Sequence, residues 1–243
     1  MVVKFKCEYN GEKFFGFQRQ GEKRTVQMAL EEAIGKYLNS EIKLAASGRT
    51  DSGVHARMQV CSFQCPVDID LFKLNAAVNA FLPADVSASD FEAADDSFHA
   101  QFSAKAKTYL YRVYINRHRS PLRDNFYHQI YKMPAVELMK DCANELVGRH
   151  CFKSFTAEQT DSHDFVREIL SFCIEQHGDE LWFWVRGSGF MRNMVRIMTG
   201  TILDIGLGKK EPDLIRKILN EPDRTAAGQT APAKALVLYD VEY

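Results

Sequence analysis

The sequence has no long apolar run and almost no excess charge of either sign. Within its 243 residues, no window reaches the roughly 18 consecutive apolar residues that a membrane-spanning helix needs. The N-terminal stretch MVVKFKCEYN has no charged region followed by a long apolar stretch, as a secretory signal would. The formal net charge is only −1, so composition alone does not indicate a nucleic-acid partner. These absences predict a cytoplasmic protein without a membrane segment.

The sequence also lacks a cysteine spacing typical of a metal site. The six cysteines are scattered, and the closest pair, Cys61 and Cys65, alternates with Phe63 on one expected strand face. We therefore expect reduced thiols in the core and no bound metal.

The chain is rich in residues that build a globular core. Hydrophobic residues make up 46% and charged residues 26%, and there are 17 Phe, which argues against disorder. A polyanion would have to be bound by a local basic surface. Each basic cluster is either a solvated face or a binding site, and the sequence leaves both open. The clusters are Arg19 with Lys23 and Arg24, Lys105 with Lys107, and Asn116 to Arg123.

Apolar periodicity predicts a regular order of elements in the first half. Alternation indicates strands, and spacing of three and four residues indicates helices. In chain order we expect a strand over 3–9, a helix over 26–38 behind Thr25 as N-cap, a short strand at Ile42 and Leu44, a strand over 61–65, a helix over 71–82 ended by Pro83, and a strand over 86–91.

The second half repeats this order with different residues. We expect a strand over 109–115, a helix that Pro134 starts and that continues to 147, a hairpin of 169–174 and 181–185 around Gly178-Asp179, a helix over 194–205, a short helix over 213–220 and a last strand over 236–243. The repeated order predicts an α+β fold of two ferredoxin-like (βαββαβ) halves with antiparallel sheets, 1–103 and 104–243, with a cleft between them.

One loop of the first half, GRTDSGV at 48–54, carries several functional groups. Asp51 before Ser52 and Gly53 is an ordinary turn signal. A turn alone does not require Arg49 and His55 as well. A metal site lacks further ligands nearby, and a phosphate-binding loop lacks its lysine. Asp51 is therefore either a turn residue or a carboxylate nucleophile that Arg49 keeps ionised.

The longer segment SGRTDSGVHARMQV, from Ser47 to Val60, closely resembles the catalytic-aspartate block of the tRNA pseudouridine synthase A family. Four further segments resemble the family's other blocks in the same order, so the resemblance spans essentially the whole chain. They are Tyr9 to Gln20, Phe98 to Val113, Gly187 to Gly200 and Asp223 to Leu238.

The resemblance implies isomerisation of uridine to pseudouridine in the anticodon stem-loop of tRNA, at positions 38, 39 and/or 40. It also implies a homodimer that needs no metal, nucleotide or redox cofactor. The family's fold, two ferredoxin-like halves whose antiparallel sheets form a continuous sheet around a central RNA-binding cleft, agrees with the element order predicted above.

The resemblance also implies three catalytic residues. Asp51 matches the nucleophile, and its attack falls either on C1′ of the ribose or on C6 of the base. Tyr109 matches a tyrosine that stacks on the base and helps to remove the C5 proton, although its strand position equally fits a core aromatic. Arg196 matches the arginine that pairs with the carboxylate, and its alternative is a solvated helix arginine.

Other positions match substrate contacts or depart from the pattern. Arg49 matches an arginine suited to fill the stack that a flipped base leaves. Leu236 and Leu238 match the apolar pocket, although packing in the last strand explains them equally well. Phe17 stands where many members carry tryptophan, and Ser52 where alanine is frequent. These changes stay near the family pattern in size class or polarity, so the resemblance still implies catalysis.

Two other function classes fit parts of the pattern. A noncatalytic RNA-binding module is the main alternative, because ferredoxin-like sheets also bind RNA by aromatic stacking. The aromatic RNA-binding signature of such sheets is missing here. A small-molecule enzyme with its site in the cleft would show no salt-dependent binding of tRNA.

Overall fold

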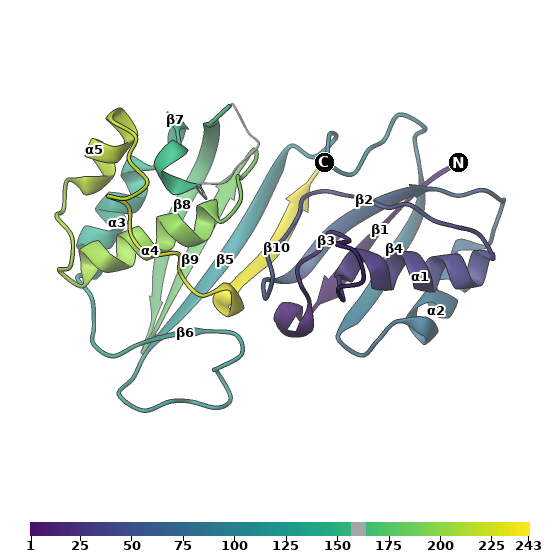
Figure 1. Ribbon diagram of the computed structural model, residues 1–243, viewed down its shortest axis with the longest axis horizontal. Coiled ribbons are helices and arrows are strands. Elements are labelled where there is room, and N and C mark those ends of the chain that lie inside the picture. Colours follow the sequence, from purple (N-terminus) through teal and green to yellow (C-terminus); the bar gives the residue numbers. More distant parts are fainter. Residues whose placement is uncertain (157–163) are drawn as a thin grey trace. The chain divides into compact units, whose positions relative to one another are not determined.

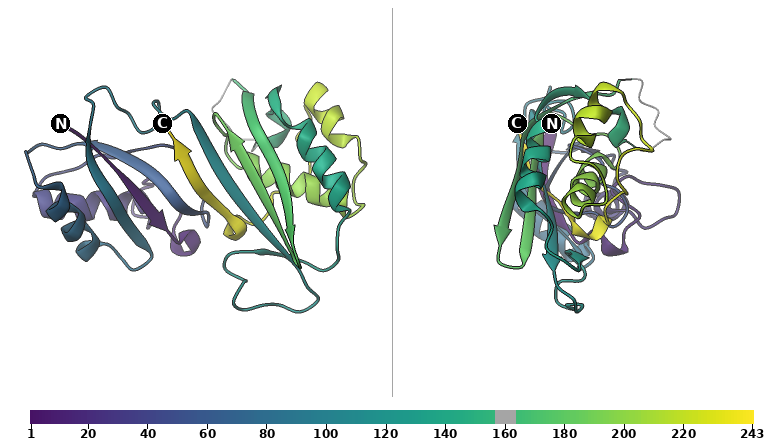
Figure 2. Two further views of the ribbon diagram at one scale, coloured as in Figure 1. Left: turned by 180° about the vertical axis from the view of Figure 1, so that it is seen from behind. Right: turned by 90° about the vertical axis from the view of Figure 1, so that its left-hand side faces the viewer.

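The computed structural model describes residues 1–156 and 164–243, which form two compact units (Figure 1). Unit 1 contains Met1–Lys105 and Val237–Tyr243, and unit 2 contains Ala106–Leu236. In each unit the helices lie on one face of a mainly antiparallel set of strands (Figure 2). The predicted α+β class is confirmed. In the described residues, no helix combines the length and apolarity needed to cross a membrane.

Unit 1 has the strand and helix order of a ferredoxin-like fold. Its elements are β1 (Val2–Tyr9), the 3-10 turn η1 (Gly11–Lys13), α1 (Val26–Leu38), β2 (Ala45–Ala46), β3 (His55–Gln64), α2 (Leu71–Phe81) and β4 (Val86–Ala94). β1 lies between β4 and β3 and is antiparallel to both, and β2 is antiparallel to β3. The resulting order β4-β1-β3-β2 is that of a split βαβ sheet.

The last strand, β10 (Leu236–Glu242), adds to the sheet of unit 1 from Val237 onward. It runs parallel to the start of β3, with Val237 opposite His55, whereas β2 pairs with the other end of β3 around Ser62. The two short pairings therefore share one edge of β3. The boundary predicted from the sequence placed all of 104–243 in the second half. In the structure residues 104–105 also belong to unit 1, and residues 237–243 join it through this pairing.

Helix α1 shows how local sequence signals act in this fold. The Thr25 side chain accepts a hydrogen bond from the Met28 N–H at 3.4 Å, and Asn39 ends the helix in the left-handed conformation with φ of 49°. Val26, Leu30 and Ile34 are fully buried. The N-cap satisfies a backbone donor, and the apolar face supplies the burial that a short helix needs for stability.

Unit 2 repeats the order strand, helix, strand, strand, helix with additional elements. It contains β5 (Ala106–Ile115), β6 (His128–Ile130), α3 (Val136–Glu145), β7 (Gly148–Cys151), the 3-10 turn η2 (Lys153–Phe155), β8 (Val166–His177), β9 (Glu180–Gly187), α4 (Met194–Gly206), α5 (Leu214–Asn220) and the 3-10 turn η3 (Ala233–Ala235). Its strand order is β5-β9-β8-β7, antiparallel throughout, and β6 pairs in parallel with the end of β5. The β8–β9 hairpin is confirmed.

Two predicted boundaries are wrong for tertiary reasons. No strand forms at Ile42 and Leu44, because the Leu44 N–H donates to the buried Glu31 carboxylate at 3.0 Å rather than to a neighbouring strand. The helix predicted to start at Pro134 begins at Val136. Ala135 has φ −74° and ψ 86°, and its N–H donates to the Gly206 carbonyl at the end of α4 at 2.8 Å.

The cysteines are free thiols, as predicted, but not all are in the core. Cys7, Cys61, Cys65 and Cys142 are buried. Cys151 is only half-buried and Cys173 is exposed, so the core assignment is wrong for these two. Cys173 points away from the core because its neighbours on β8, Phe172 and Ile174, face inward and side chains alternate along a strand.

Candidate active site

The loop that carries Asp51 connects β2 to β3 in unit 1. Asp51 is half-buried, and its backbone carbonyl accepts a hydrogen bond from the Val54 N–H at 3.1 Å. Gly53 lies between them with φ of 79°. A backbone hydrogen bond therefore closes this turn. The expected turn exists, and the function of the Asp51 side chain is a separate question.

Residues 9–17 support the loop on the side of Thr50. The Tyr9 hydroxyl and the Thr50 hydroxyl are 2.8 Å apart and hydrogen-bonded, and the Phe17 N–H donates to the Thr50 carbonyl at 3.1 Å. Gly16 has φ of 86°, and a Cβ there would lie 2.8 Å from the Thr50 carbonyl oxygen. The segment therefore approaches the residue before Asp51 more closely than any side chain at position 16 would permit.

The same segment holds the residues that follow Asp51. The Phe14 carbonyl accepts hydrogen bonds from the Ser52 hydroxyl at 3.2 Å and from the Gly53 N–H at 3.4 Å. The Gly11 N–H donates to Nδ1 of the buried His55 at 3.0 Å. His55 therefore has a role in anchoring the loop to η1. Residues 11–14, which follow β1, are thus linked to the loop by contacts between positions far apart in sequence.

A buried glutamine holds the beginning of the loop. The Gln59 side-chain amide donates to the Gly48 carbonyl at 2.7 Å, and its carbonyl oxygen accepts from the Ser47 hydroxyl. Ser47 and Gln59 are fully buried. The residues on both sides of Asp51 are thus fixed by buried groups, which is the preorganisation that a catalytic side chain requires. Sequence reasoning assigned no role to Gln59 or Tyr9, although both lie in the segments that resemble the family blocks.

Arg49 and Asp51 are the predicted site residues that lie in unit 1. Arg49 is exposed, whereas the next residue, Thr50, is buried. An exposed guanidinium beside a rigid loop is able to reach a ligand without disturbing the loop. Tyr109, Arg196 and Leu236 belong to unit 2.

Tyr109 lies on β5 opposite Val185 of β9 and is 7% exposed. Its ring meets the edge of Phe190 at a centroid distance of 5.1 Å with an interplanar angle of 86°. On the same strand, burial raises the pKa of Tyr111 far above its usual range, against the opposing effect of the Arg196 charge. The Tyr111 phenol therefore stays protonated in the folded protein.

Arg196 lies in the first turn of α4 and is held by two hydrogen bonds. Its Nε donates to the Ala231 carbonyl at 2.8 Å, and its Nη1 donates to Oδ1 of Asn193 at 2.7 Å. The Ala231 N–H in turn donates to the Arg196 carbonyl at 3.2 Å. Arg196 is half-buried. It is not a freely solvated helix arginine, because its orientation is fixed from two sides.

The segment that holds Arg196 packs tightly on α4. A Cβ on Gly200 would lie 2.0 Å from the Gln229 carbonyl oxygen, and one on Gly228 would lie 2.6 Å from Cα of Thr201. The Gly228 N–H donates to the Thr201 hydroxyl at 2.9 Å. These contacts join the two sequence blocks 187–200 and 223–238. Leu236 is 4% exposed, which fits packing as well as a pocket role.

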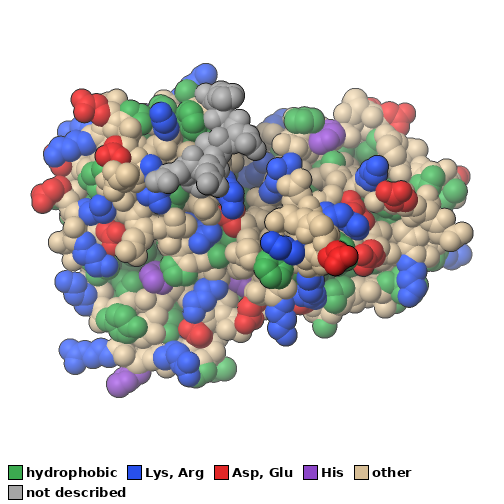
Figure 3. Space-filling view, in the orientation of Figure 1, with side chains coloured by type: hydrophobic (Ala, Val, Ile, Leu, Met, Phe, Trp, Pro, Cys, Tyr) green, Lys and Arg blue, Asp and Glu red, His purple; other side chains and the backbone are tan. Residues whose placement is uncertain are grey.

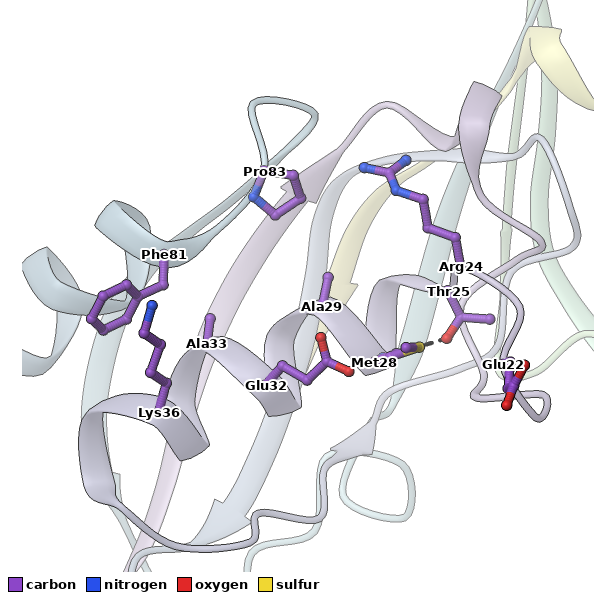
Figure 4. A pocket seen from close by; sticks show the side chains of 10 residues that line it. All are labelled: Glu22, Arg24, Thr25, Met28, Ala29, Glu32, Ala33, Lys36, Phe81 and Pro83. Atoms are coloured by element: carbon purple, nitrogen blue, oxygen red, sulfur yellow. Dashed lines mark hydrogen bonds between the residues drawn. The ribbon is translucent and has the colours of Figure 1, made fainter.

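A pocket of about 380 Å³ lies elsewhere in unit 1, between α1 and the end of α2 (Figure 4). Lys36 extends toward the Phe81 ring there, with Nζ 4.2 Å from the ring centroid. None of the predicted site residues lines this pocket. We therefore do not assign the reaction to it. Residues 1–156 and 164–243 contain no group of three His, Cys, Asp or Glu side chains that could hold a metal ion.

Comparison with known proteins identifies the family. A family model described as tRNA pseudouridine synthase matches residues 7–103 and 142–243. The chain belongs to the tRNA pseudouridine synthase family. The predicted resemblance is confirmed, and the matched residues include Asp51, Arg49 and Arg196.

Full-length relatives agree with the family model. The chain is 43% identical over 246 aligned positions to the tRNA pseudouridine synthase A of Bacillus subtilis, with 100% of this chain and 99% of the relative covered. It is 39% identical to the protein of the same name from Syntrophotalea carbinolica, with 100% and 96% covered. A solved H/ACA RNP bound to a substrate RNA aligns with a TM-score of 0.32 and 16% identity, over 83% of this chain and 53% of that one, which is too slight a likeness to support an argument.

Proposed function

We propose that this chain isomerises uridine to pseudouridine in the anticodon stem-loop of tRNA, at positions 38, 39 and/or 40, with Asp51 as nucleophile. The observation that carries the proposal is the Asp51 loop itself. Tyr9 and Phe17 hold the residue before Asp51, and Phe14 holds the two residues after it. Such bracing around a half-buried carboxylate, in a member of this family, favours a catalytic role over a turn role.

The reaction requires no external reactant, since uridine and pseudouridine have the same composition. The bond from N1 of the base to C1′ breaks, a bond from C5 to C1′ forms, and the C5 proton is finally replaced by a proton on N1. Asp51 attacks C1′ or C6 and so releases the base for rotation. Tyr109 stacks on the base and assists removal of the C5 proton. No metal or redox cofactor takes part.

Two arginines support this chemistry in our proposal. Arg196 supplies the positive charge that keeps the Asp51 carboxylate ionised. The hydrogen bonds to Ala231 and Asn193 support this by fixing the direction of its guanidinium. The exposed Arg49 enters the RNA stack in place of the flipped uridine and offsets part of the cost of flipping. Leu236 contributes to the apolar wall around the base.

The partners follow from the same proposal. The protein binds tRNA in the cytoplasm and acts as a homodimer. The chain has a formal net charge of only −1. Figure 3 shows basic side chains interspersed with acidic ones on the face that it presents. Local basic clusters therefore supply the contacts to the phosphates, and binding weakens with rising salt.

Replacing the carboxylate tests the proposal most directly. Asp51→Asn keeps the shape of the side chain but removes the nucleophile, so we expect pseudouridine formation to fall at least about 1,000-fold while the affinity for tRNA stays within about threefold. Unmodified tRNA is incubated with each protein, and pseudouridine is mapped at every anticodon-arm uridine. Asp96→Asn is the matched control, because Asp96 is exposed on a turn of the same unit.

Two results would contradict the proposal. Wild-type protein that forms no pseudouridine at any anticodon-arm uridine, yet binds tRNA, would favour the noncatalytic RNA-binding module. An Asp51→Asn protein with the rate of wild type would exclude Asp51 as nucleophile while leaving the activity in place. Full activity of Asp96→Asn shows that the loss is specific to position 51.

A further inference from the structure

An aromatic side chain stands in solvent directly beside the Asp51 loop. Phe15 is 52% exposed, although its neighbours Phe14 and Gly16 both contact the loop through their backbones. The Phe14 ring, by contrast, is buried. Phe15 therefore presents its ring to solvent from a segment whose neighbouring residues contact the Asp51 loop.

The backbone of Phe15 is fixed on both sides. Its N–H donates to the Arg24 carbonyl at 2.9 Å, and its carbonyl accepts from the Gln20 side chain at 3.1 Å. Arg24 is itself held by two hydrogen bonds to Asp85, at 2.7 and 2.9 Å, and its guanidinium lies 3.9 Å from the Phe14 ring centroid. The backbone that carries this ring does not have to be ordered when a ligand arrives, which lowers the entropic cost of binding.

A lysine accompanies this ring. Lys23 Nζ lies 5.4 Å from the Phe15 ring centroid, within the range of a cation–π contact. The Lys23 N–H donates to the Gln20 carbonyl at 3.1 Å, so the lysine sits on a tight turn. An ammonium beside an exposed aromatic ring is the pairing that binds an unpaired nucleotide, since the ring stacks on the base and the cation meets a phosphate.

Other exposed aromatic side chains of unit 1 do not adjoin the Asp51 loop. Phe81 is 42% exposed and has Lys36 Nζ 4.2 Å from its ring centroid, but it lies at the end of α2. Phe72 is 82% exposed but lies in the first turn of α2, and Phe102 is 78% exposed but stacks on His99 at a centroid distance of 4.3 Å. Isolated exposed aromatics are common on protein surfaces and need no explanation. Phe15 differs because its neighbours on both sides are bonded to or packed on the loop of Asp51.

We propose that Phe15 and Lys23 form a stacking site for an unpaired RNA base next to the uridine that Asp51 attacks. The inference rests on the proposed function and adds to it a residue, Phe15, that binds the flanking nucleotide by stacking. Because every base has a π-face, such a platform tolerates different neighbouring bases. It holds the strand in place while the target uridine leaves the stack.

Binding and turnover measured on the full chain test the site. The probe is an anticodon stem-loop RNA that carries 2-aminopurine beside the target uridine, whose fluorescence falls on stacking. We expect Phe15→Ala to weaken binding and raise KM about tenfold, with kcat within about threefold of wild type, and to abolish the quenching. Phe15→Trp is expected to retain the binding and the fluorescence quenching of wild type. Lys23→Gln weakens binding about threefold and makes the salt dependence less steep.

Two further variants separate stacking from folding and from simple apolar contact. Phe72→Ala is the matched control and is expected to leave binding, KM and quenching unchanged. Phe15→Leu keeps apolar volume without a π-face and is expected to lose quenching as Phe15→Ala does. Wild-type quenching and KM in both Phe15→Ala and Phe15→Leu, with pseudouridine still formed, would overturn the site and leave the proposed function standing. Wild-type protein that forms no pseudouridine would overturn both.

Discussion

At Gly16 the chain passes so close to the Asp51 loop that no side chain fits. The residue has φ of 86°, and its hypothetical Cβ lies 2.8 Å from the Thr50 carbonyl oxygen and 3.3 Å from the Asp51 carbonyl carbon. Gly21, a few residues on, also has positive φ, at 56°, but nothing lies within 4 Å of its Cβ position. Alanine substitutions at Gly16 and Gly21 therefore separate the energetic cost of a left-handed backbone from the cost of displacing the loop.

We expect Gly16→Ala to lower the free energy of unfolding by about 2 kcal/mol and to reduce pseudouridine formation by more than tenfold, because the loop must move. Gly21→Ala carries only the left-handed strain, about 1 kcal/mol, and retains the rate of wild type. Urea denaturation and initial rates at saturating tRNA measure both effects. Equal activities in the two variants would show that the close approach at position 16 does not position Asp51.

At the scale of elements, α4 and the segment 228–231 pack closely against each other around Arg196. Gly200, in the middle of α4, lets the Gln229 carbonyl approach to a point 2.0 Å from where a Cβ would be. The same segment supplies the Ala231 carbonyl that holds Arg196. Displacing the segment from the helix therefore also releases the arginine.

In an exposed helix interior, Gly→Ala stabilises by up to about 1 kcal/mol. At position 200 we expect the opposite sign. Gly200→Ala should destabilise by about 3 kcal/mol, because backbone rather than a flexible side chain occupies the space. Thermal unfolding measures the change, and Gly208→Ala, which has positive φ but open space, is the control. A stabilised Gly200→Ala protein would show that the segment yields easily and does not fix Arg196.

At the scale of the whole molecule, the pKa shifts predict how stability depends on pH. Burial lowers the pKa of His128 below 6.5, assisted by the charges of Lys234 and Lys209. The folded state thus disfavours protonation of His128. The stability that the neutral imidazole contributes is present above pH 6.5 and is lost as pH falls toward the pKa of His128 in the folded state. Burial raises the pKa of Cys142 from 9.0 to about 11, so its contribution is present below pH 9 and is lost between 9 and 11.

We expect a stability plateau between about pH 6.5 and 9, with a decline on either side. His128→Gln should flatten the acid limb. Cys142→Ala should make the alkaline limb less steep while lowering the plateau through lost packing, and Cys61, whose pKa burial also raises, accounts for the rest of that limb. Urea midpoints from pH 5 to 10 measure both. A wild-type midpoint that keeps rising below pH 6.5, or an acid limb unchanged in His128→Gln, would contradict the assignment.

The sequence by itself determined the order of the long strands and helices and the residue types available for the chemistry. Thr25 and the apolar face of α1 define that helix locally, and alternation defines β1 and β5, because these signals act between residues a few positions apart. The blocks around Asp51 and Arg196 were recognisable for the same reason, since each is contiguous. The short strands β6 and β7 gave no such signal, because three or four residues show no periodicity.

Only the tertiary structure decided which distant groups meet. Leu44 bonds to Glu31 instead of a strand, Ala135 bonds to Gly206 and delays α3, and 237–243 join unit 1 through β3. The bracing of the Asp51 loop by Tyr9 spans 41 positions in sequence. Such pairings depend on how the elements pack, and packing brings together side chains whose separation along the chain carries no local pattern.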